Sequence, residues 1–253
     1  MLSEKKSLLG IQIDTVSKEE ALQKARVFLR GSGQHMIFTP NPEMLVAANT
    51  DAYFQDVLNA ADINLCDGVG LLLFAGHSVS RIAGVDFMTE LLRLAEDMNK
   101  KVYFLGSGQT KTIDALKKNV VLQFPNIRIV GEHIGHLISQ SETGQLRYDT
   151  SENDDIVQDI ILAAPDMLFV AFGHGKQEKW IYEQLPDLPS VKIAMGVGGA
   201  FDFLAGTQKR APKLLQSLGL EWLWRLALEP KRIKRILNAV VVFPWYVLKD
   251  KLQ

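Results

Sequence analysis

The chain has 253 residues, 47% of them hydrophobic, and a formal net charge of −1 at neutral pH. This composition excludes a disordered protein, and the length suits one α/β domain with or without an appendage. The only cysteine, Cys66, excludes an internal disulfide and favours a reducing compartment. No apolar stretch follows the first residues, so we expect no secretory signal.

From residue 9 to residue 206, short apolar segments alternate with longer amphipathic ones, a pattern typical of βαβ units. Strands are predicted at residues 9–13, 36–39, 63–66, 102–105, 127–130, 167–172 and 193–197. Helices are predicted at residues 18–29, 42–60, 85–99, 110–123, 154–163 and 177–184, the first after an N-cap at Ser17. The polar segment 139–155 is predicted to be a surface loop. We therefore predict an α/β, Rossmann-like fold, with a mainly parallel sheet covered by helices on both faces.

The pattern changes after Gly206, where helical segments follow one another with no strand between them. These segments are predicted at residues 212–217, 220–227, 230–237 and 239–251. Pro230 suits the first position of a helix, where its missing N–H needs no partner. We interpret residues 1–206 as an α/β body and residues 207–253 as a helical C-terminal appendage.

Charge is divided unevenly between these two parts. The appendage has ten Lys or Arg and three Asp or Glu, which leaves the body with 18 basic and 26 acidic residues. Three of the four Trp also lie in the appendage. Cationic side chains interleaved with indole and aliphatic ones favour binding to an anionic membrane surface, although a helical lid with solvated basic residues is the alternative. The apolar stretch 236–248 is too short to span a bilayer, which takes about 20 residues.

Five of the predicted strands end in small or polar residues. In a parallel sheet the carboxyl ends of the strands border the ligand site, so these residues are candidates for binding. They include Thr39, Asn41, Asp67, Gly106, Gly108, Gln177, Gly198 and Gly199. Glycine permits close backbone approach, and helix N-termini offer N–H donors to phosphate. A glycine pair after a strand is also often only a tight turn, so each signal is weak alone.

Asp67 directly follows a predicted buried strand and precedes a glycine turn, a position that suits a general base. The alternative role of Asp67 is a helix N-cap. No Asp-x-Asp occurs in the chain, which argues against a metal-clamped nucleotide-sugar site. A diphosphate would then need cationic side chains. The appendage offers Arg225, Arg232 and Arg235, unless these form only a solvated basic face.

Several other chemistries have little support in the sequence. His133 and His136 lack a Cys or acidic partner at metal-ligand spacing, so a surface or turn role is favoured over a metal site. No Gly-x-Ser-x-Gly elbow occurs and Cys66 has no motif-level His partner, which disfavours a covalent hydrolase. Nucleic-acid binding is disfavoured because the body is acidic and the basic residues alternate with apolar ones.

Eleven short segments form a recognisable series along the chain. They are Thr39-Pro40-Asn41, Asp67-Gly68-Val69-Gly70, Arg81-Ile82-Ala83-Gly84-Val85-Asp86, Tyr103-Phe104-Leu105-Gly106, Gly131-Glu132-His133-Ile134-Gly135-His136, Pro165-Asp166, Gly173-His174-Gly175-Lys176-Gln177-Glu178-Lys179-Trp180, Gly196-Val197-Gly198-Gly199-Ala200-Phe201-Asp202, Arg210-Ala211-Pro212, Gly219-Leu220-Glu221-Trp222 and Glu229-Pro230-Lys231-Arg232. Taken in order, these segments resemble the WecG/TagA/CpsF family of bacterial N-acetylmannosaminyl-type glycosyltransferases. The resemblance covers nearly the whole chain from about residue 9. Two positions depart from it, because Gly175 stands where Pro is usual and His136 where Tyr is common.

The resemblance implies a metal-independent, inverting transfer of N-acetylmannosamine, or a related N-acetylhexosamine, from a UDP-sugar. The implied acceptor is a polyprenyl-diphosphate-linked N-acetylglucosamine, and the product serves teichoic acid or related surface-polysaccharide synthesis. No cofactor is implied, because the UDP-sugar is a substrate. The implied location is cytoplasmic and peripheral, on the inner face of the bacterial membrane, with the appendage as the docking element.

The resemblance also implies roles for individual residues. Asp67 would deprotonate the acceptor hydroxyl, while Thr39 and Gln177 would orient the donor sugar. Asn41 would hold the sugar or the neighbouring backbone. The three appendage arginines would neutralise the charge that develops on the departing UDP. The other implied substrate contacts are Arg81, Asp86, Gly106, Gly108, Gly198 and Gly199.

Two rival functions stay open on the residues alone. A doubly wound oxidoreductase or methyltransferase would use Gly106-Ser107-Gly108 as a turn for NAD or S-adenosylmethionine, but it leaves the basic appendage unexplained. A membrane-associated adaptor would bind UDP without turnover. Exposed Leu and Trp side chains of an undocked appendage would also favour homo-oligomers away from the membrane.

Overall fold

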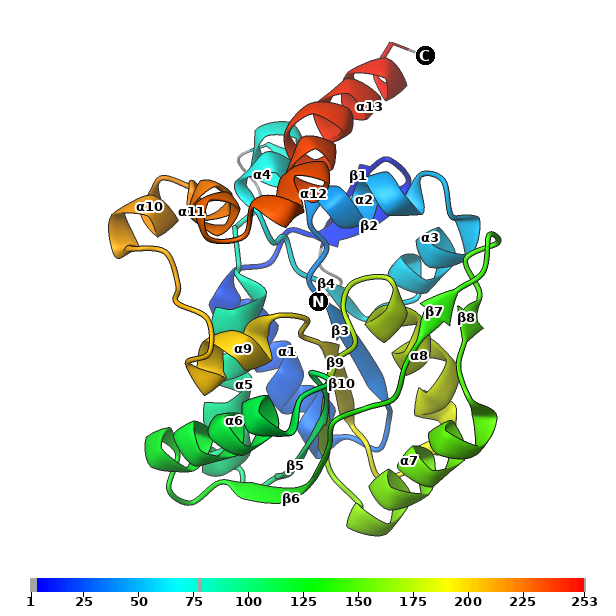
Figure 1. Cartoon of the computed structure of the whole chain (residues 1–253), viewed down its shortest axis with the longest axis vertical. Coiled ribbons are helices and arrows are strands. Elements are labelled where there is room, and N and C mark those ends of the chain that lie inside the picture. Colours follow the sequence, from blue (N-terminus) through cyan, green and yellow to red (C-terminus); the bar gives the residue numbers. More distant parts are fainter. Residues whose placement is uncertain (1–3, 77–78, 253) are drawn as a thin grey trace.

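The computed structural model describes residues 4–76 and 79–252, and its centre is a six-stranded sheet (Figure 1). The strand order is β4-β3-β10-β9-β5-β6, and every neighbouring pair runs parallel. The strands are β3 His35–Phe38, β4 Ile63–Asn64, β5 Lys101–Gly106, β6 Arg128–His133, β9 Met167–Ala171 and β10 Ile193–Gly196. This arrangement confirms the predicted α/β, Rossmann-like sheet.

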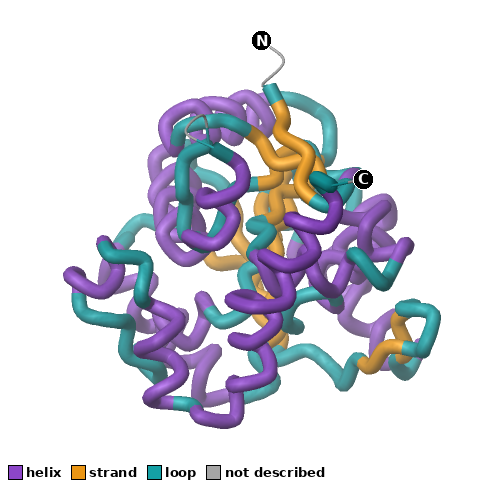
Figure 2. Tube along the Cα trace, turned by 90° about the horizontal axis from the view of Figure 1, so that it is seen from above, coloured by secondary structure: helices purple, strands orange, loops and turns teal. Residues whose placement is uncertain are grey.

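Helices cover both faces of the sheet, as predicted, so the strands lie in the middle of the molecule (Figure 2). One face packs against α1 Lys18–Arg30, α5 Gly84–Asp97, α6 Thr110–Gln123 and α9 Ala200–Ala205. The other packs against α2 Pro42–Ala48, α3 Ala52–Asn59, α7 Thr150–Ala163 and α8 Lys176–Gln184, which continues into the short η1 Leu185–Asp187. Alternate strand residues supply the two cores, so Phe104 faces the first group and Tyr103 the second.

The first predicted strand, residues 9–13, is not part of this sheet, which corrects the prediction. Instead β1 Lys5–Leu8 and β2 Ile11–Asp14 form a separate antiparallel hairpin. Leu9 and Gly10 between them have positive φ values of 50° and 77°, the backbone of a tight two-residue hairpin turn. That turn folds β2 back onto β1, so β2 finds its partner next to it in the chain.

Two predicted helix starts are confirmed. The Ser17 hydroxyl accepts the Glu20 N–H at 3.2 Å, and the Glu20 carboxylate accepts the Ser17 N–H at 2.8 Å. This reciprocal capping box begins α1. Pro230 occupies the first position of the short 3-10 turn η2 Pro230–Arg232.

The structure corrects several predicted element boundaries and adds elements that were not predicted. The helix predicted at 42–60 is divided into α2 and α3, because the Asp51 carboxylate accepts the Phe54 N–H at 2.9 Å and starts a new helix. The loop predicted at 139–155 contains the hairpin β7 Ser139–Gln140 and β8 Leu146–Arg147, and α7 begins at Thr150 after the N-cap Asp149. The short helices α4 Val69–Ala75 and α9, with seven and six residues, were not predicted.

The region after α9 is helical, and no strand follows β10 in the part of the chain that the structure describes. Its elements are α10 Lys213–Ser217, α11 Glu221–Leu228, η2, α12 Ile233–Leu237, η3 Asn238–Val242 and α13 Phe243–Asp250. Figure 1 shows α12 and α13 rising beside α2 and α4. Phe243 is fully buried and stacks edge-on against Phe74 of α4, with ring centroids 5.6 Å apart. The division of the chain into two domains at Gly206 stays a prediction.

Candidate active site

A cavity of about 730 Å³ opens at the carboxyl edge of the central sheet. Its lining joins residues just after β3, β4, β9 and β10 to residues of α4 and of the C-terminal helices. This edge is where parallel α/β sheets bind their ligands. The predicted site residues that line the cavity are Thr39, Asn41, Asp67, Arg81, Gln177, Gly198, Gly199, Arg225, Arg232 and Arg235. The fold thus brings together residues that lie almost 200 positions apart in the chain.

Asp67 is the carboxylate of this cavity whose acidity is most altered by the fold. It is mostly buried, and the Gly84 N–H donates to its Oδ2 at 3.3 Å. Burial raises the pKa of Asp67 from 3.8 to about 6. The negative charge of Glu221 raises this pKa as well, while the guanidinium groups of Arg81 and Arg225 lower it. A carboxylate with a pKa near 6 accepts protons readily at physiological pH, which suits a general base.

Thr39 and Asn41 lie beside Asp67 in the turn between β3 and α2. Thr39 packs against Gly84, where an added Cβ would approach the Thr39 hydroxyl to 2.9 Å. Asn41 is the N-cap of α2, since its Oδ1 accepts the Met44 N–H at 3.0 Å. Asn41 therefore fixes the start of α2 and lines the cavity at the same time.

Both polar atoms of the Gln177 side-chain amide form hydrogen bonds within the protein. Its Oε1 accepts the N–H groups of Gly173 at 3.2 Å and Gly198 at 3.0 Å. Its Nε2 donates to Glu178 Oε1 at 2.7 Å. Gln177 therefore connects the turns that follow β9 and β10, and it holds Gly198 in place at the cavity wall.

Glu178 is a buried carboxylate that sequence reasoning did not single out as a titratable site. Its Oε2 accepts the Gly175 N–H at 2.6 Å, and burial raises its pKa to about 7. Gly175 itself has a φ of 79°, in the left-handed region that proline cannot adopt. A proline at position 175 would therefore require a different backbone in the turn before α8. Glu178 belongs to the Gln177-Glu178 pair that the sequence analysis quoted. Its raised pKa could not be predicted there, because burial depends on the fold.

Arg225 offers the cavity a guanidinium that the protein neutralises little. It lies over the ring of Phe203, 5.1 Å from the centroid, and its Nη2 approaches Gly199. Its Nε is buried without a hydrogen-bond partner among the described residues. Burial lowers the pKa of Arg225, and the charge of Arg232 lowers it further. An anion bound beside Gly199 would relieve both effects.

Arg232 and Arg235 are held at the cavity by carboxylates. Arg232 Nε pairs at 2.6 Å with Glu229, the residue directly before η2. Arg235 donates to both oxygens of Glu43 on α2, from Nε at 2.7 Å and from Nη2 at 2.9 Å. His174 lies 3.2 Å from Arg235 Nη2 through its Nδ1, and burial lowers the pKa of this histidine. Sequence reasoning found the arginines but missed Glu43 and His174, because their contact with Arg235 is long-range.

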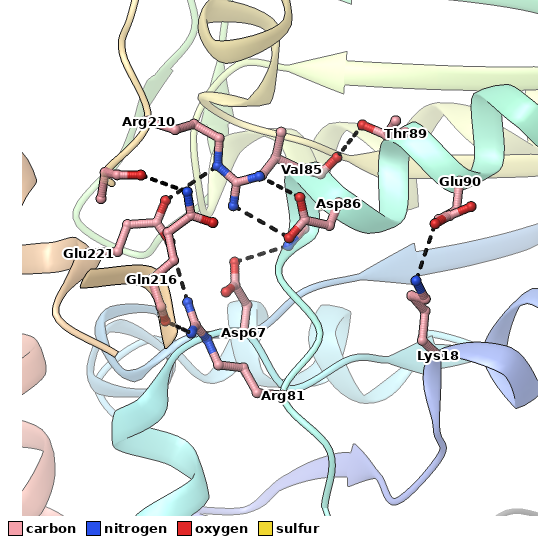
Figure 3. A network of polar contacts seen from close by, with 12 residues as sticks. Lys18, Asp67, Arg81, Val85, Asp86, Thr89, Glu90, Arg210, Gln216 and Glu221 are labelled. Carbon is pink, nitrogen blue, oxygen red and sulfur yellow. Dashed lines mark hydrogen bonds and ion pairs between the residues drawn. The ribbon is translucent and has the colours of Figure 1, made fainter. Parts of the chain in front are cut away.

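A network of charged side chains joins the C-terminal helices to the body beside Asp67 (Figure 3). Arg81 donates to the Gln216 carbonyl at 2.9 Å and to Glu221 at 3.3 Å. Arg210 contacts Glu221 at 3.6 Å and also pairs with Asp86. Arg210 and Glu221 belong to the Arg-Ala-Pro…Glu-Trp segments of the sequence. They position α10 and α11 over the site.

Three predicted substrate contacts lie outside the described cavity lining. Asp86 is half-exposed in a neighbouring hollow, where Arg210 neutralises it. Gly106 packs closely against the backbone of Ala171, as shown by the 2.6 Å that would separate an added Cβ from the Ala171 carbonyl oxygen. Gly108 faces open space, although Ser107 between the two glycines does line the cavity. The turn after β5 thus reaches the cavity through Ser107.

His136, the second departure from the family pattern, lies beside the cavity. Its ring packs edge-on against Tyr148 and Phe172, with centroids 5.2 Å and 5.7 Å apart. Burial lowers the pKa of His136. Since Phe172 lines the cavity, His136 touches the site through one aromatic ring.

The residues that the structure describes contain no group of three or more His, Cys, Asp or Glu side chains arranged to hold a metal ion. That the reaction needs no metal stays a prediction. No helix within residues 4–76 and 79–252 is both long and apolar enough to cross a membrane.

Comparisons with known proteins show which family the chain belongs to. The family described as "Glycosyl transferase WecG/TagA/CpsF family" matches residues 6–253. The chain belongs to this family. It is a glycosyltransferase, and the cavity with Asp67 and the three arginines is its candidate active site.

Curated relatives cover nearly the whole chain. An "N-acetylglucosaminyldiphosphoundecaprenol N-acetyl-beta-D-mannosaminyltransferase" of Staphylococcus aureus strain NCTC 8325 / PS 47 is 30% identical over 254 aligned residues. The alignment covers 98% of this chain and 93% of the relative. A protein of the same name from strain MRSA252 has the same identity and coverage.

Proposed function

We propose that this glycosyltransferase moves N-acetylmannosamine, or a related N-acetylhexosamine, from a UDP-sugar to a polyprenyl-diphosphate-linked N-acetylglucosamine. The names of the S. aureus relatives support this choice of sugar and acceptor. The observation that carries the proposal is the meeting of Asp67 with Arg225, Arg232 and Arg235 in one cavity. The product would serve teichoic acid or related surface-polysaccharide synthesis.

The chemistry follows from the two kinds of charge in the cavity. The acceptor hydroxyl oxygen attacks the anomeric carbon from the face opposite UDP, and its proton passes to the Asp67 carboxylate. The bond between the anomeric carbon and the phosphate oxygen breaks, and its electron pair leaves on UDP. The transfer therefore inverts the anomeric centre. Arg225 and its two neighbours neutralise the departing diphosphate, which makes a metal unnecessary.

Donor binding is assigned to the strand-end turns. Thr39 and Asn41 line the cavity together with Asp67, which supports assigning them to the sugar. Gln177 acts by holding the Gly198 turn, since its amide is engaged with Gly173, Gly198 and Glu178. The Arg225 guanidinium, whose Nη2 lies beside Gly199, would then face the diphosphate.

The C-terminal helices are assigned to the inner face of the cell membrane. They expose large apolar side chains, among them Trp222, Leu228, Ile233, Trp245 and Leu248. The same region carries ten basic residues, which anionic headgroups attract. Docking there would place the cavity beside a lipid-linked acceptor. The same apolar surface would favour homo-oligomers when no membrane is present.

UDP release from UDP-N-acetylmannosamine tests the proposal, with and without a short-chain lipid-diphosphate N-acetylglucosamine and in the presence of EDTA. We expect release that depends on the acceptor and survives EDTA. Loss of activity in EDTA would contradict the arginine account of leaving-group stabilisation. UDP binding with no release from any UDP-sugar would instead support a membrane adaptor without turnover.

A further inference from the structure

One wall of the cavity is charged at Asp67, just before α4, and apolar along α4 itself. The chain leaves β4, passes Asp67 and enters α4, whose lining residues are Val69, Gly70, Leu73 and Phe74. Leu73 lies a full turn beyond Val69, and it is 76% exposed. The wall therefore begins at the proposed general base and ends in an uncovered leucine.

The facing wall, formed by the C-terminal helices, also has charged residues first and apolar residues second. Arg232 and Arg235 line the cavity first, and Ile236, Ala239 and Val240 line it further along the same helical path. This stretch includes η3, a π-helical segment, a form found frequently at functional sites. Val240 is 45% exposed. Figure 1 shows α12 next to α4, with α13 leading away from the sheet.

Close backbone contacts fix these two walls at their inner side. A Cβ at Gly70 would lie 2.8 Å from Pro42 Cγ and 3.9 Å from the Ala239 carbonyl oxygen, so α4 lies against α2 and η3. The turn between α10 and α11 also closes on α4, since a Cβ at Gly219 would lie 2.2 Å from Val69 Cγ2. Leu218 of this turn and Trp222 at the start of α11 also line the cavity, and both are exposed. The outer end of the cavity is therefore an apolar slot between α4, η3 and the α10–α11 turn.

We propose that this apolar slot binds the first isoprene units of the acceptor's polyprenyl chain, an inference that rests on the proposed function. Along both walls the order is carboxylate or arginine first and hydrocarbon second. The acceptor has the same order, with a sugar hydroxyl, a diphosphate and then an isoprenoid. The lipid next to the diphosphate is thus bound by protein, and the membrane receives only the rest of the chain.

The arginines beside the slot favour a hydrocarbon that carries an anionic group at one end. Arg232 and Arg235 lie beside the slot in the lining, so a ligand that fills it carries its anionic group at the start of its chain. Burying an apolar chain against Leu73 and Val240 contributes about 25 cal/mol for each Å² removed from water. That surface is exposed in the protein alone.

Binding of farnesyl diphosphate and methyl diphosphate to the full chain tests this inference by calorimetry, in buffer without lipid or detergent. We expect farnesyl diphosphate to bind at least about tenfold more tightly, because only its tail reaches the slot. Leu73→Ser and Val240→Ser should remove most of that preference and leave the Kd of methyl diphosphate unchanged. Leu237→Ser is the matched control, since Leu237, at the end of α12 directly before η3, is 48% exposed but outside the described lining.

The outcomes separate this inference from the proposed function. Equal Kd values for the two diphosphates in the wild-type chain would overturn the slot, as would an equal loss in Leu237→Ser. Acceptor-dependent UDP release would still establish the transferase in that case. A tail preference that is lost in Leu73→Ser would support the slot even if no UDP release were found, and that absence would count against the proposed reaction alone.

Discussion

Replacing Asp67 by Asn should lower turnover but raise the free energy of unfolding, because the fold destabilises the charged form of this carboxylate. Burial raises the pKa of Asp67 from 3.8 to about 6. An unfolded chain ionises this group above 3.8, whereas the folded chain holds its proton until about pH 6. The free energy of unfolding therefore falls as the pH rises through this window. The full loss is at most about 3 kcal/mol, at 1.36 kcal/mol for each pKa unit.

Asparagine does not titrate, and its side-chain oxygen can still accept the Gly84 N–H. We therefore expect Asp67→Asn to raise the free energy of unfolding at pH 7.5 by up to about 3 kcal/mol. Each kcal/mol corresponds to roughly 2–4 °C in Tm for a chain of this size. Turnover should fall about 10²- to 10⁴-fold, because the general base is lost. The wild-type rate should itself fall below pH 6, where Asp67 becomes protonated.

Thermal unfolding and acceptor-dependent UDP release measure these two effects on the same samples. Asp114→Asn is the control for the lost negative charge, since Asp114 is exposed on α6 outside the described lining. Near-wild-type turnover in Asp67→Asn would refute the assignment of the base. A Tm that stays constant or falls would refute the claim that burial disfavours the charged carboxylate.

Further substitutions test the other parts of the site. Arg225→Ala should lower the rate of UDP release about 10²- to 10³-fold, because it removes a poorly neutralised cation from the diphosphate position; a loss below fivefold would contradict this role. Glu221→Gln should move the acid limb of the pH–rate profile to lower pH, since the charge of Glu221 raises the pKa of Asp67; an unmoved limb would exclude this electrostatic contact. Truncation after residue 206 should abolish turnover and retain UDP binding, and an active truncation would exclude the C-terminal arginines from catalysis. Lys179→Met should lower the free energy of unfolding in denaturant by about 3–5 kcal/mol, because it leaves Asp51 without its fully buried partner; an unchanged midpoint would refute that.

The strand-end reasoning predicted the body of the site well. Thr39, Asp67 and Gly198 follow strands directly or closely, and parallel strands place such residues at one edge of the sheet. The same reasoning did not separate Ser107, which lines the cavity, from Gly106 and Gly108, which lie outside the described lining. A glycine signal reports a tight turn, and which atoms of that turn face the ligand depends on packing.

Contacts between the body and the C-terminal helices were the part that sequence reasoning missed. The pairing of Arg235 with Glu43 spans 192 positions, and that of Arg81 with Glu221 spans 140. No local pattern reports such a pair, because both partners are ordinary surface charges in the sequence. Their roles appear only when α11 and α12 lie beside α2 and the residues before α5.

The sequence by itself determined the alternation of buried strands and helices, the capped start of α1 and the basic, Trp-rich character of the C-terminal region, because these depend on neighbouring residues. It misplaced residues 9–13, where the tight turn at Leu9 and Gly10 took the strand out of the sheet. Only the tertiary structure decided the pKa of Asp67 and the burial of the Arg225 guanidinium beside the cavity. Burial and long-range charge set both properties, and neither exists until the chain has folded.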